Sequence, residues 1–133
     1  MRESKTIVKK AKYGKGLFAN EDIKYTRLVK DRPIIISFEF KKTNLKKWER
    51  LVETLKIPDD AGMYENNSIK YDPTFTNPKK PPKWYRLNHS FSPNAEIKSK
   101  GKLVYWTPLR DINKGEEIKF DYGQADPSWS KTD

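Results

Sequence analysis

Two short polar segments of the 133-residue chain contain the side chains that could do chemistry. The first, Leu87–Ala95, places the one histidine of the protein, His89, among two asparagines and two serines. It has little hydrophobic periodicity, so it predicts a polar loop, the kind of segment on which sites are often built. The second, Gly115–Gly123, begins with a turn and continues as a short strand that ends in an aromatic–acidic–aromatic–glycine unit.

A third segment near the N-terminus, Tyr13–Ala19, contains two glycines separated by a lysine. Together the three segments resemble the SET domain, the fold of most protein lysine methyltransferases. In that family, Gly-x-Gly, Asn-His-Ser-x-x-Pro-Asn and Gly-Glu-Glu-Leu-x-x-x-Tyr segments occur in this order. The matches cover residues 13–20, 87–96 and 112–123. Each motif is weak by itself, but the three in this order, in a chain of this length, form a specific signal.

The resemblance implies S-adenosylmethionine as the cofactor, S-adenosylhomocysteine as its product, and no metal. In the family, the segment equivalent to Lys15, Gly16 and Leu17 offers backbone groups to this cofactor, and glycines allow a close approach of the backbone. Asn88 and His89 are then expected to bind the polar and adenine ends of the cofactor. A lone histidine would otherwise suggest acid–base chemistry, but the resemblance implies a binding and structural role.

Tyr122 matches the catalytic tyrosine of the family, whose hydroxyl contacts both the target amine and the cofactor. The amine must be neutral to attack a methyl group, whereas free lysine has a pKa of about 10.4. A narrow apolar channel favours the neutral amine by desolvation. The predicted channel residues are Tyr122, Tyr105 and Phe120, which shares a strand face with Tyr122. Phenylalanine at this position implies capacity for di- or trimethylation. The family often has an aromatic residue after the catalytic tyrosine, so Trp129 is expected to stack on adenine or to close the channel.

The composition excludes several other kinds of site. The chain has no cysteine, which rules out disulfides and thiolate metal ligands. With a single histidine, a zinc site would need mostly carboxylate ligands, a set that zinc rarely uses. The first residues, Met1–Lys5, lack the apolar core of a signal peptide, and no apolar run approaches the roughly 20 residues of a membrane span. We therefore expect an intracellular location, with the nucleus as one option, which would be the host nucleus for a viral protein.

The formal net charge is +10, from 28 Lys and Arg against 18 Asp and Glu. This excess suggests an anionic partner such as nucleic acid or a nucleoprotein, although scattered basic residues fit a solvated surface equally well. The expected substrate, a histone tail, is also basic, so binding calls for a locally acidic groove. The acidic residues near the matched motifs are Glu96, Asp111, Glu116, Glu117 and Asp121.

The hydrophobic pattern predicts a mainly β domain with one convincing helix. Short strands are expected at residues 6–8, 17–19, 33–40, 95–97, 103–107 and 118–123. Thr43 or Asn44 should cap a helix that Pro58 limits, and the proline-rich residues 63–83 should lack regular structure.

The resemblance adds a β-clip-like SET fold of small curled sheets with one or two short helices. Its C-terminal pseudoknot would join residues 87–95 to residues 118–123. We expect one domain over residues 1–133, with a variable insert at about 41–83 and a short tail at 124–133.

Some features depart from the family pattern. Tyr85-Arg86-Leu87 stands where Arg-Phe-Ile is common, Phe91 replaces a frequent cysteine, and the cysteine-rich module that completes the lysine channel in many relatives is missing. Compact viral and bacterial SET proteins are more similar to this chain. Two alternatives stay open: a non-enzymatic chromatin or nucleic-acid binding module on the same fold, and a methyltransferase of a non-histone basic protein. The sequence does not predict the oligomeric state.

Overall fold

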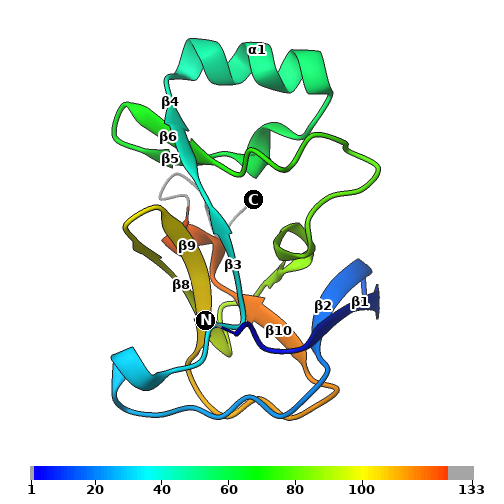
Figure 1. Cartoon of the computed structure of the whole chain (residues 1–133). Coiled ribbons are helices and arrows are strands. Elements are labelled where there is room, and N and C mark those ends of the chain that lie inside the picture. Colours follow the sequence, from blue (N-terminus) through cyan, green and yellow to red (C-terminus); the bar gives the residue numbers. More distant parts are fainter. Residues whose placement is uncertain (1, 126–133) are drawn as a thin grey trace.

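The computed structural model describes residues 2–125, and most of its regular structure is strand, arranged in three small sheets (Figure 1). The strands of the first sheet, in spatial order, are β1 (Thr6–Ala11), β2 (Gly14–Ala19), β10 (Glu117–Phe120) and β7 (Asn88–His89). Those of the second are β3 (Ile36–Glu39), β9 (Leu103–Pro108) and β8 (Ala95–Lys100). Those of the third are β4 (Lys41–Thr43), β6 (Ser68–Tyr71) and β5 (Met63–Glu65). This confirms the prediction of a mainly β fold of small sheets.

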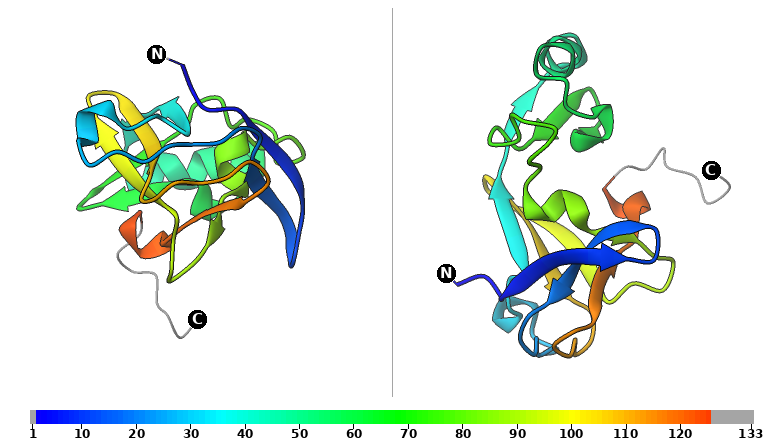
Figure 2. Two further views of the ribbon diagram at one scale, coloured as in Figure 1. Left: turned by 90° about the horizontal axis from the view of Figure 1, so that it is seen from below. Right: turned by 90° about the vertical axis from the view of Figure 1, so that its right-hand side faces the viewer.

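The α-helix α1 (Leu45–Leu55) lies with the third sheet at one end of the molecule, and the first sheet lies toward the other (Figures 1 and 2). Asn44 is the N-cap, one of the two predicted, because its side chain accepts a hydrogen bond from the backbone N–H of Lys47 at 2.9 Å. Four 3-10 helices complete the described structure: η1 (Val29–Asp31), η2 (Asp59–Ala61), η3 (Lys83–Arg86) and η4 (Tyr122–Gln124). Within residues 2–125, no helix is both long and apolar enough to cross a membrane.

The first sheet brings together the two polar segments that are far apart in the sequence. β7 and β10 run parallel, with Asn88 opposite Lys119 and His89 opposite Phe120. Asn94, only 5% exposed, fastens the loop after β7 to the same strand. Its side-chain amide donates to the carbonyl of Glu117 at 2.8 Å, and its side-chain oxygen accepts from the backbone N–H of Lys119 at 2.9 Å. A buried amide needs such partners, so the loop has one fixed position against β10.

A row of aromatic rings connects the second sheet to the first through the core. Trp84, on η3, stacks on Phe38 with ring centroids 4.9 Å apart and lies parallel to Trp106 at 6.1 Å. Trp106, on β9, meets Phe120, on β10, edge-to-face at 5.5 Å. All four rings are buried. Such pairs add about 0.5–1.5 kcal/mol each to the burial of their area, so this row forms a firm apolar wall.

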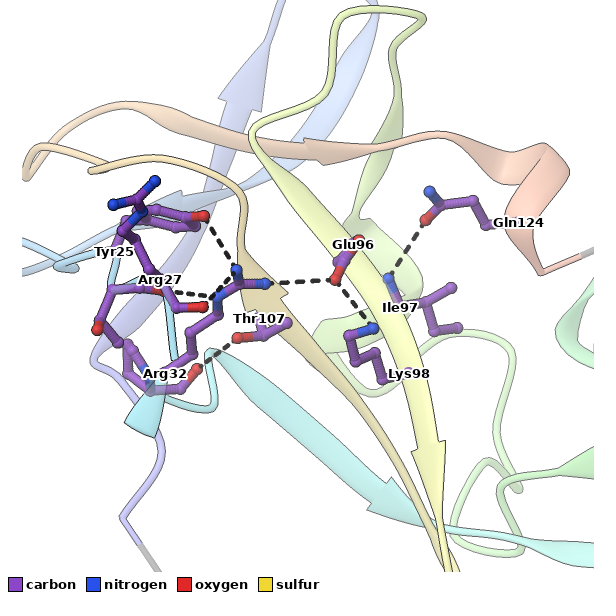
Figure 3. Close-up of polar contacts among 10 residues, drawn as sticks. Tyr25, Arg27, Arg32, Glu96, Ile97, Lys98, Thr107 and Gln124 are labelled. Carbon is purple, nitrogen blue, oxygen red and sulfur yellow. Dashed lines mark hydrogen bonds and ion pairs between the residues drawn. The ribbon is translucent and has the colours of Figure 1, made fainter. Parts of the chain in front are cut away.

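Polar contacts hold η4, the short helix that begins at Tyr122, against the second sheet. The side chain of Gln124 accepts a hydrogen bond from the backbone N–H of Ile97 on β8 at 3.4 Å (Figure 3). On the neighbouring residue, the Glu96 carboxylate pairs with Arg32 at 3.6 Å and with Lys98 at 3.1 Å. The position of Tyr122 is therefore tied to β8 as well as to β10.

The prediction that residues 63–83 lack regular structure is wrong in its first part, where β5 and β6 form an antiparallel hairpin. Asn66, at the turn, has a φ of 54°, a left-handed conformation that asparagine tolerates better than most residues. The prolines begin only after β6, at Pro73, so they exclude strands from the later part of the segment alone. A two-residue asparagine turn was the signal for the hairpin.

Other strand boundaries also differ from the predictions. The long strand expected at 33–40 is shorter, Ile36–Glu39, although Ile35 still donates its backbone N–H to the carbonyl of Trp106 at 2.8 Å. β8 continues to Lys100, beyond its predicted end, because the turn falls at Gly101, which has a φ of 60°. The bounds of the strands that carry the first and third motifs differ as well. β1 continues to Ala11 and β2 begins at Gly14, so the first two strands are longer than predicted. The strand expected at 118–123 ends at Phe120, and Tyr122 begins η4. The prediction that Phe120 and Tyr122 share a strand face is therefore wrong, because the chain leaves the strand between them.

Candidate active site

A cavity of about 460 Å³ lies where the three motif segments meet. Residues from β7, η3, β10, η4 and the β1–β2 turn line it, together with residues of the insert that follows α1. The lining residues are Tyr13, Gly14, Lys15, Asp60, Gly62, Met63, Trp84, Tyr85, Arg86, Leu87, Asn88, Trp106, Phe120, Tyr122 and Ala125. The lining includes aromatic rings from η3, β9, β10 and η4 as well as the polar side chains of Asp60 and Asn88.

Tyr122 is held from three directions. Its hydroxyl donates a hydrogen bond to the backbone carbonyl of Leu87 at 2.7 Å, and its backbone N–H donates to Nδ1 of His89 at 3.0 Å. Its ring lies 5.2 Å from that of His89 and 5.2 Å from that of Phe120. Burial, followed by the negative charges of Asp60 and Glu117, raises the pKa of Tyr122 to about 12. At neutral pH the hydroxyl is therefore a hydrogen-bond donor and not a base.

The raised pKa predicts a particular alkaline behaviour. The unfolded chain releases this phenolic proton near pH 10, whereas the folded protein holds it to about pH 12. The contribution to stability is thus complete below pH 10 and is lost as the pH rises toward 12. We expect the free energy of unfolding to decline less steeply across this window in Tyr122→Phe than in the wild type. Urea unfolding at stepped pH values measures both slopes, and identical slopes would contradict the assignment.

The predicted channel residues have different positions relative to the cavity. Phe120, which is 6% exposed, and Tyr122 both line it. Tyr105 does not; its neighbour Trp106 lines the cavity instead. Successive side chains of a strand point to opposite faces, and Tyr105 stands in register between Ser37 and Lys98. The structure therefore does not bring Tyr105 together with the other two.

Of the predicted cofactor-binding residues, Lys15, Asn88 and Tyr122 line the cavity, whereas Gly16 is not among its lining residues. The Asn88 amide donates to the carbonyl of Lys15 at 3.1 Å and to Oε2 of Glu117 at 2.7 Å. Gly16 lies against the same carboxylate, since a Cβ added to it would stand 2.5 Å from Oε2 of Glu117. Glu117 thus couples β2 to β7, a role that sequence reasoning missed because it assigned this residue to an acidic groove.

His89 and Leu17, two further predicted cofactor-binding residues, do not line the cavity. Nδ1 of His89 accepts the backbone N–H of Tyr122, so in the neutral ring the proton is on Nε2. His89 therefore fixes the backbone of Tyr122. Leu17 is fully buried in the core. Trp129 lies outside residues 2–125.

The insert contributes a carboxylate that the sequence did not single out. Asp60 lines the cavity and accepts a hydrogen bond from the hydroxyl of Tyr85 at 2.7 Å, and burial raises the pKa of Tyr85. Its neighbour Asp59 anchors η2 by accepting from Trp48 Nε1 at 3.2 Å and from the Tyr64 hydroxyl at 2.9 Å. A pair of aspartates in a loop has no periodic pattern, so no sequence signal distinguished Asp60.

The acidic residues expected near the motifs are mostly engaged within the protein. Glu96 pairs with Arg32 and Lys98, and Glu116 pairs with Arg110 at 3.1 Å. None of the five predicted acidic residues lines the cavity. Within residues 2–125, no group of three or more histidines and carboxylates is placed to hold a metal ion.

Comparison with known proteins agrees with this geometry. The family model of the SET domain matches residues 14–123. None of the curated proteins compared matches the sequence. A proposed histone methyltransferase of Plasmodium falciparum has a similar structure, with a TM-score of 0.60 and 19% identity over 92% of this chain and 96% of that one.

Polycomb Repressive Complex 2 of Chaetomium thermophilum, bound to GSK126, matches with a TM-score of 0.66 and 18% identity over 96% of this chain and 17% of that one. A humanized mutant of this complex, bound to the same inhibitor, matches with a TM-score of 0.69 and 20% identity over 96% and 16% of the two chains. At these identities the solved structures establish the fold, and the family model spans most of the sequence. The chain therefore belongs to the SET domain family.

Proposed function

We propose that this protein transfers methyl groups from S-adenosylmethionine to lysine side chains of another protein, with a histone tail as the expected target. One observation carries the proposal above all others. The partly buried hydroxyl of Tyr122 lines an aromatic cavity that is built from all three family motifs, and its proton is donated to the carbonyl of Leu87. Its oxygen is therefore a fixed acceptor, suited to holding an N–H group of a neutral amine while the lone pair stays free.

The cavity fits the cofactor in size and in chemistry. Its volume of about 460 Å³ falls within the range of small-molecule sites. The Asn88 amide and the Lys15 backbone offer polar contacts to the cofactor. When bound there, S-adenosylmethionine would supply a methyl group activated by its positively charged sulfur.

The protein's own residues would prepare the lysine for attack. The rings of Trp106, Phe120 and Tyr122 remove water from the amine, which favours its neutral form. The hydroxyl of Tyr122 donates its proton to the carbonyl of Leu87 at 2.7 Å, so both oxygens are held in place and can accept hydrogen bonds from the N–H groups of the amine. Fixing the direction of the amine lone pair is the main contribution that a rigid site makes to an in-line displacement.

Asp60 supplies a negative charge that can attract a basic substrate to this basic protein. It is exposed and lies at the cavity, so a cationic side chain can meet a negative group as it enters. Tyr85 occupies one of its oxygens and fixes its direction. A chromatin substrate would place the protein in the nucleus, and the description of the similar Plasmodium falciparum protein as a proposed histone methyltransferase agrees with that choice.

A binding experiment followed by a transfer experiment tests the proposal. Calorimetry with S-adenosylhomocysteine should show binding in a stoichiometry of one per chain. Labelled S-adenosylmethionine should then label a protein band when nucleosomes, free histones or cell lysate are added. If the protein does not bind the cofactor, the result favours a non-enzymatic binding module. If the labelled band is not a histone, the substrate is a different basic protein.

The degree of methylation depends on Phe120. Its neighbours at the cavity are the rings of Trp106 and Tyr122, with centroids 5.5 Å and 5.2 Å away, so the space beside the amine is apolar. Phe120→Tyr would add a hydroxyl that needs a partner when buried, and an ordered water is the simplest one. That water would fill the room for a methylated amine.

We therefore expect Phe120→Tyr to make the first transfer at a comparable rate and to stop there, whereas the wild type continues to di- or trimethyl-lysine. Mass spectrometry of the product over time shows the distribution. If the wild type itself stops at monomethyl-lysine, or the variant reaches the same final state as the wild type, Phe120 is an ordinary core residue.

A further inference from the structure

A second hollow lies at the end of the molecule that carries α1, apart from the candidate active site. Its volume is about 510 Å³, and it runs between the first half of α1 and the β5–β6 turn. We call it the α1 groove. Its lining residues are Asn44, Leu45, Lys46, Lys47, Arg50, Tyr64, Asn66, Asn67, Ser68 and Ile69. It shares no residue with the active-site cavity.

The charged side chains that line the α1 groove are all basic. Lys46, Lys47 and Arg50 line it together with amide groups, and no carboxylate does. Within residues 2–125, none of these three cations forms an ion pair, although α1 also carries Glu49 and Glu53. Three cations of one helix thus lie together on one surface.

The stability of the fold does not account for this arrangement. Lys46 and Arg50 are four residues apart on the helix, a spacing at which like charges repel. Lys46 and Lys47 lie in the first turn, where the helix dipole disfavours cations and where α1 has no acidic residue. Leu45 is 51% exposed beside them. The two charge arrangements cost some stability, which is consistent with a binding role.

We propose that the α1 groove binds the phosphodiester backbone of a nucleic acid, independently of its base sequence. Guanidinium and ammonium groups contact phosphate oxygens, and the asparagine amides can donate to the same oxygens. The net charge of +10 favours a long polyanion over a short acidic peptide, since many separated charges must be neutralised together. The helix of 11 residues, about 16 Å long, can follow successive phosphates of one strand.

Salt dependence gives the sharpest test, because each phosphate contact adds about 0.9 to the slope of log affinity against log salt concentration. The probe is a fluorescently labelled random-sequence DNA duplex, measured by anisotropy with the full chain. In the triple variant Lys46→Gln, Lys47→Gln, Arg50→Gln, we expect the slope to fall by about 2 to 3. From 50 to 200 mM salt, the wild type should lose about 40-fold more affinity than this variant.

A control variant removes the same charge from the other end of the molecule. Lys24, Lys30 and Lys114 are exposed; Lys30 belongs to η1, and the other two belong to loops. The segments around residues 24–30 and 114 lie at the end of the molecule opposite α1 (Figure 1). Their triple replacement by glutamine should leave the slope nearly as in the wild type. Equal losses in the two triple variants would show a general charge effect and would overturn the proposal.

Two further readouts keep the test independent of folding and of catalysis. Thermal unfolding should show that the α1 variant is folded, since Trp48, the buried anchor of the helix, is unchanged. Poly-glutamate of equal charge should compete far less well than unlabelled DNA; equal competition would assign the groove to an acidic protein instead. DNA binding needs no methyl transfer, so the result is separate from the proposed enzymatic function.

Discussion

Replacing Tyr122 by phenylalanine is expected to lower the turnover of methyl transfer by about a hundredfold or more, the scale at which lost positioning is felt. The ring keeps its packing against Phe120 and His89, and only the hydrogen bond to the carbonyl of Leu87 disappears. The stability loss should therefore be small, about 1 kcal/mol. The amine, in contrast, loses the hydroxyl oxygen that accepts from its N–H group and fixes its direction.

Tyr105→Phe is the matched control for this variant. It also removes one tyrosine hydroxyl, but Tyr105 does not line the cavity. Initial rates at saturating cofactor and peptide should be near those of the wild type. If Tyr105→Phe loses as much turnover as Tyr122→Phe, Tyr105 takes part in the lysine channel as the sequence predicted. The cavity lined by Phe120 and Tyr122 would then not be the whole channel.

The second large effect is expected from Gly16→Ala, which should weaken cofactor binding by about ten- to a hundredfold. The new Cβ would stand 2.5 Å from Oε2 of Glu117 and 3.1 Å from Cβ of Ala11. The carboxylate must turn away, and Asn88 then loses the acceptor that holds its amide at 2.7 Å. Calorimetry with S-adenosylhomocysteine measures the loss.

Gly115→Ala separates this effect from a general cost of replacing glycine. Gly115 has a φ of 94° and open space around its Cα, so alanine there is strained without touching any neighbour. We expect a stability loss of about 1–2 kcal/mol with unchanged cofactor affinity. Equal affinities for Gly16→Ala and the wild type would show that Glu117 moves freely and that the Asn88 contact is not needed.

The parts of the site that the sequence predicted are those fixed by local chemistry. The Asn88–His89 segment and the strand that leads to Tyr122 carry residue types that an ordinary loop or strand does not require. Their meeting across β7 and β10 followed from the resemblance, because no local pattern indicates a parallel pair so distant in sequence. Asn44 was predicted as a cap for a local reason as well, its position just before an apolar periodic segment.

The parts that could not be predicted depend on pairing between elements. The sequence of β9 does not determine which of its two faces points into the core, because either set of alternate side chains could be buried. Pairing with β3 determines it: Trp106 stands opposite Ile36 and faces the core, so Tyr105 points to the other face. A change of one residue in phase exchanges the two faces. Asp60 reaches the cavity because Asp59 anchors η2 through Trp48, a contact that follows from the packed position of α1.

The central claim is that the cavity around Tyr122 transfers methyl groups to lysine. S-adenosylmethionine with a deuterated methyl group tests it directly when the protein is incubated with intact nucleosomes and the histones are analysed by tandem mass spectrometry. The account predicts deuterated methyl groups on lysine side chains with the wild type and with Tyr105→Phe, and almost none with Tyr122→Phe. Labelled lysine that persists undiminished in Tyr122→Phe, or transfer to a residue other than lysine, would contradict it.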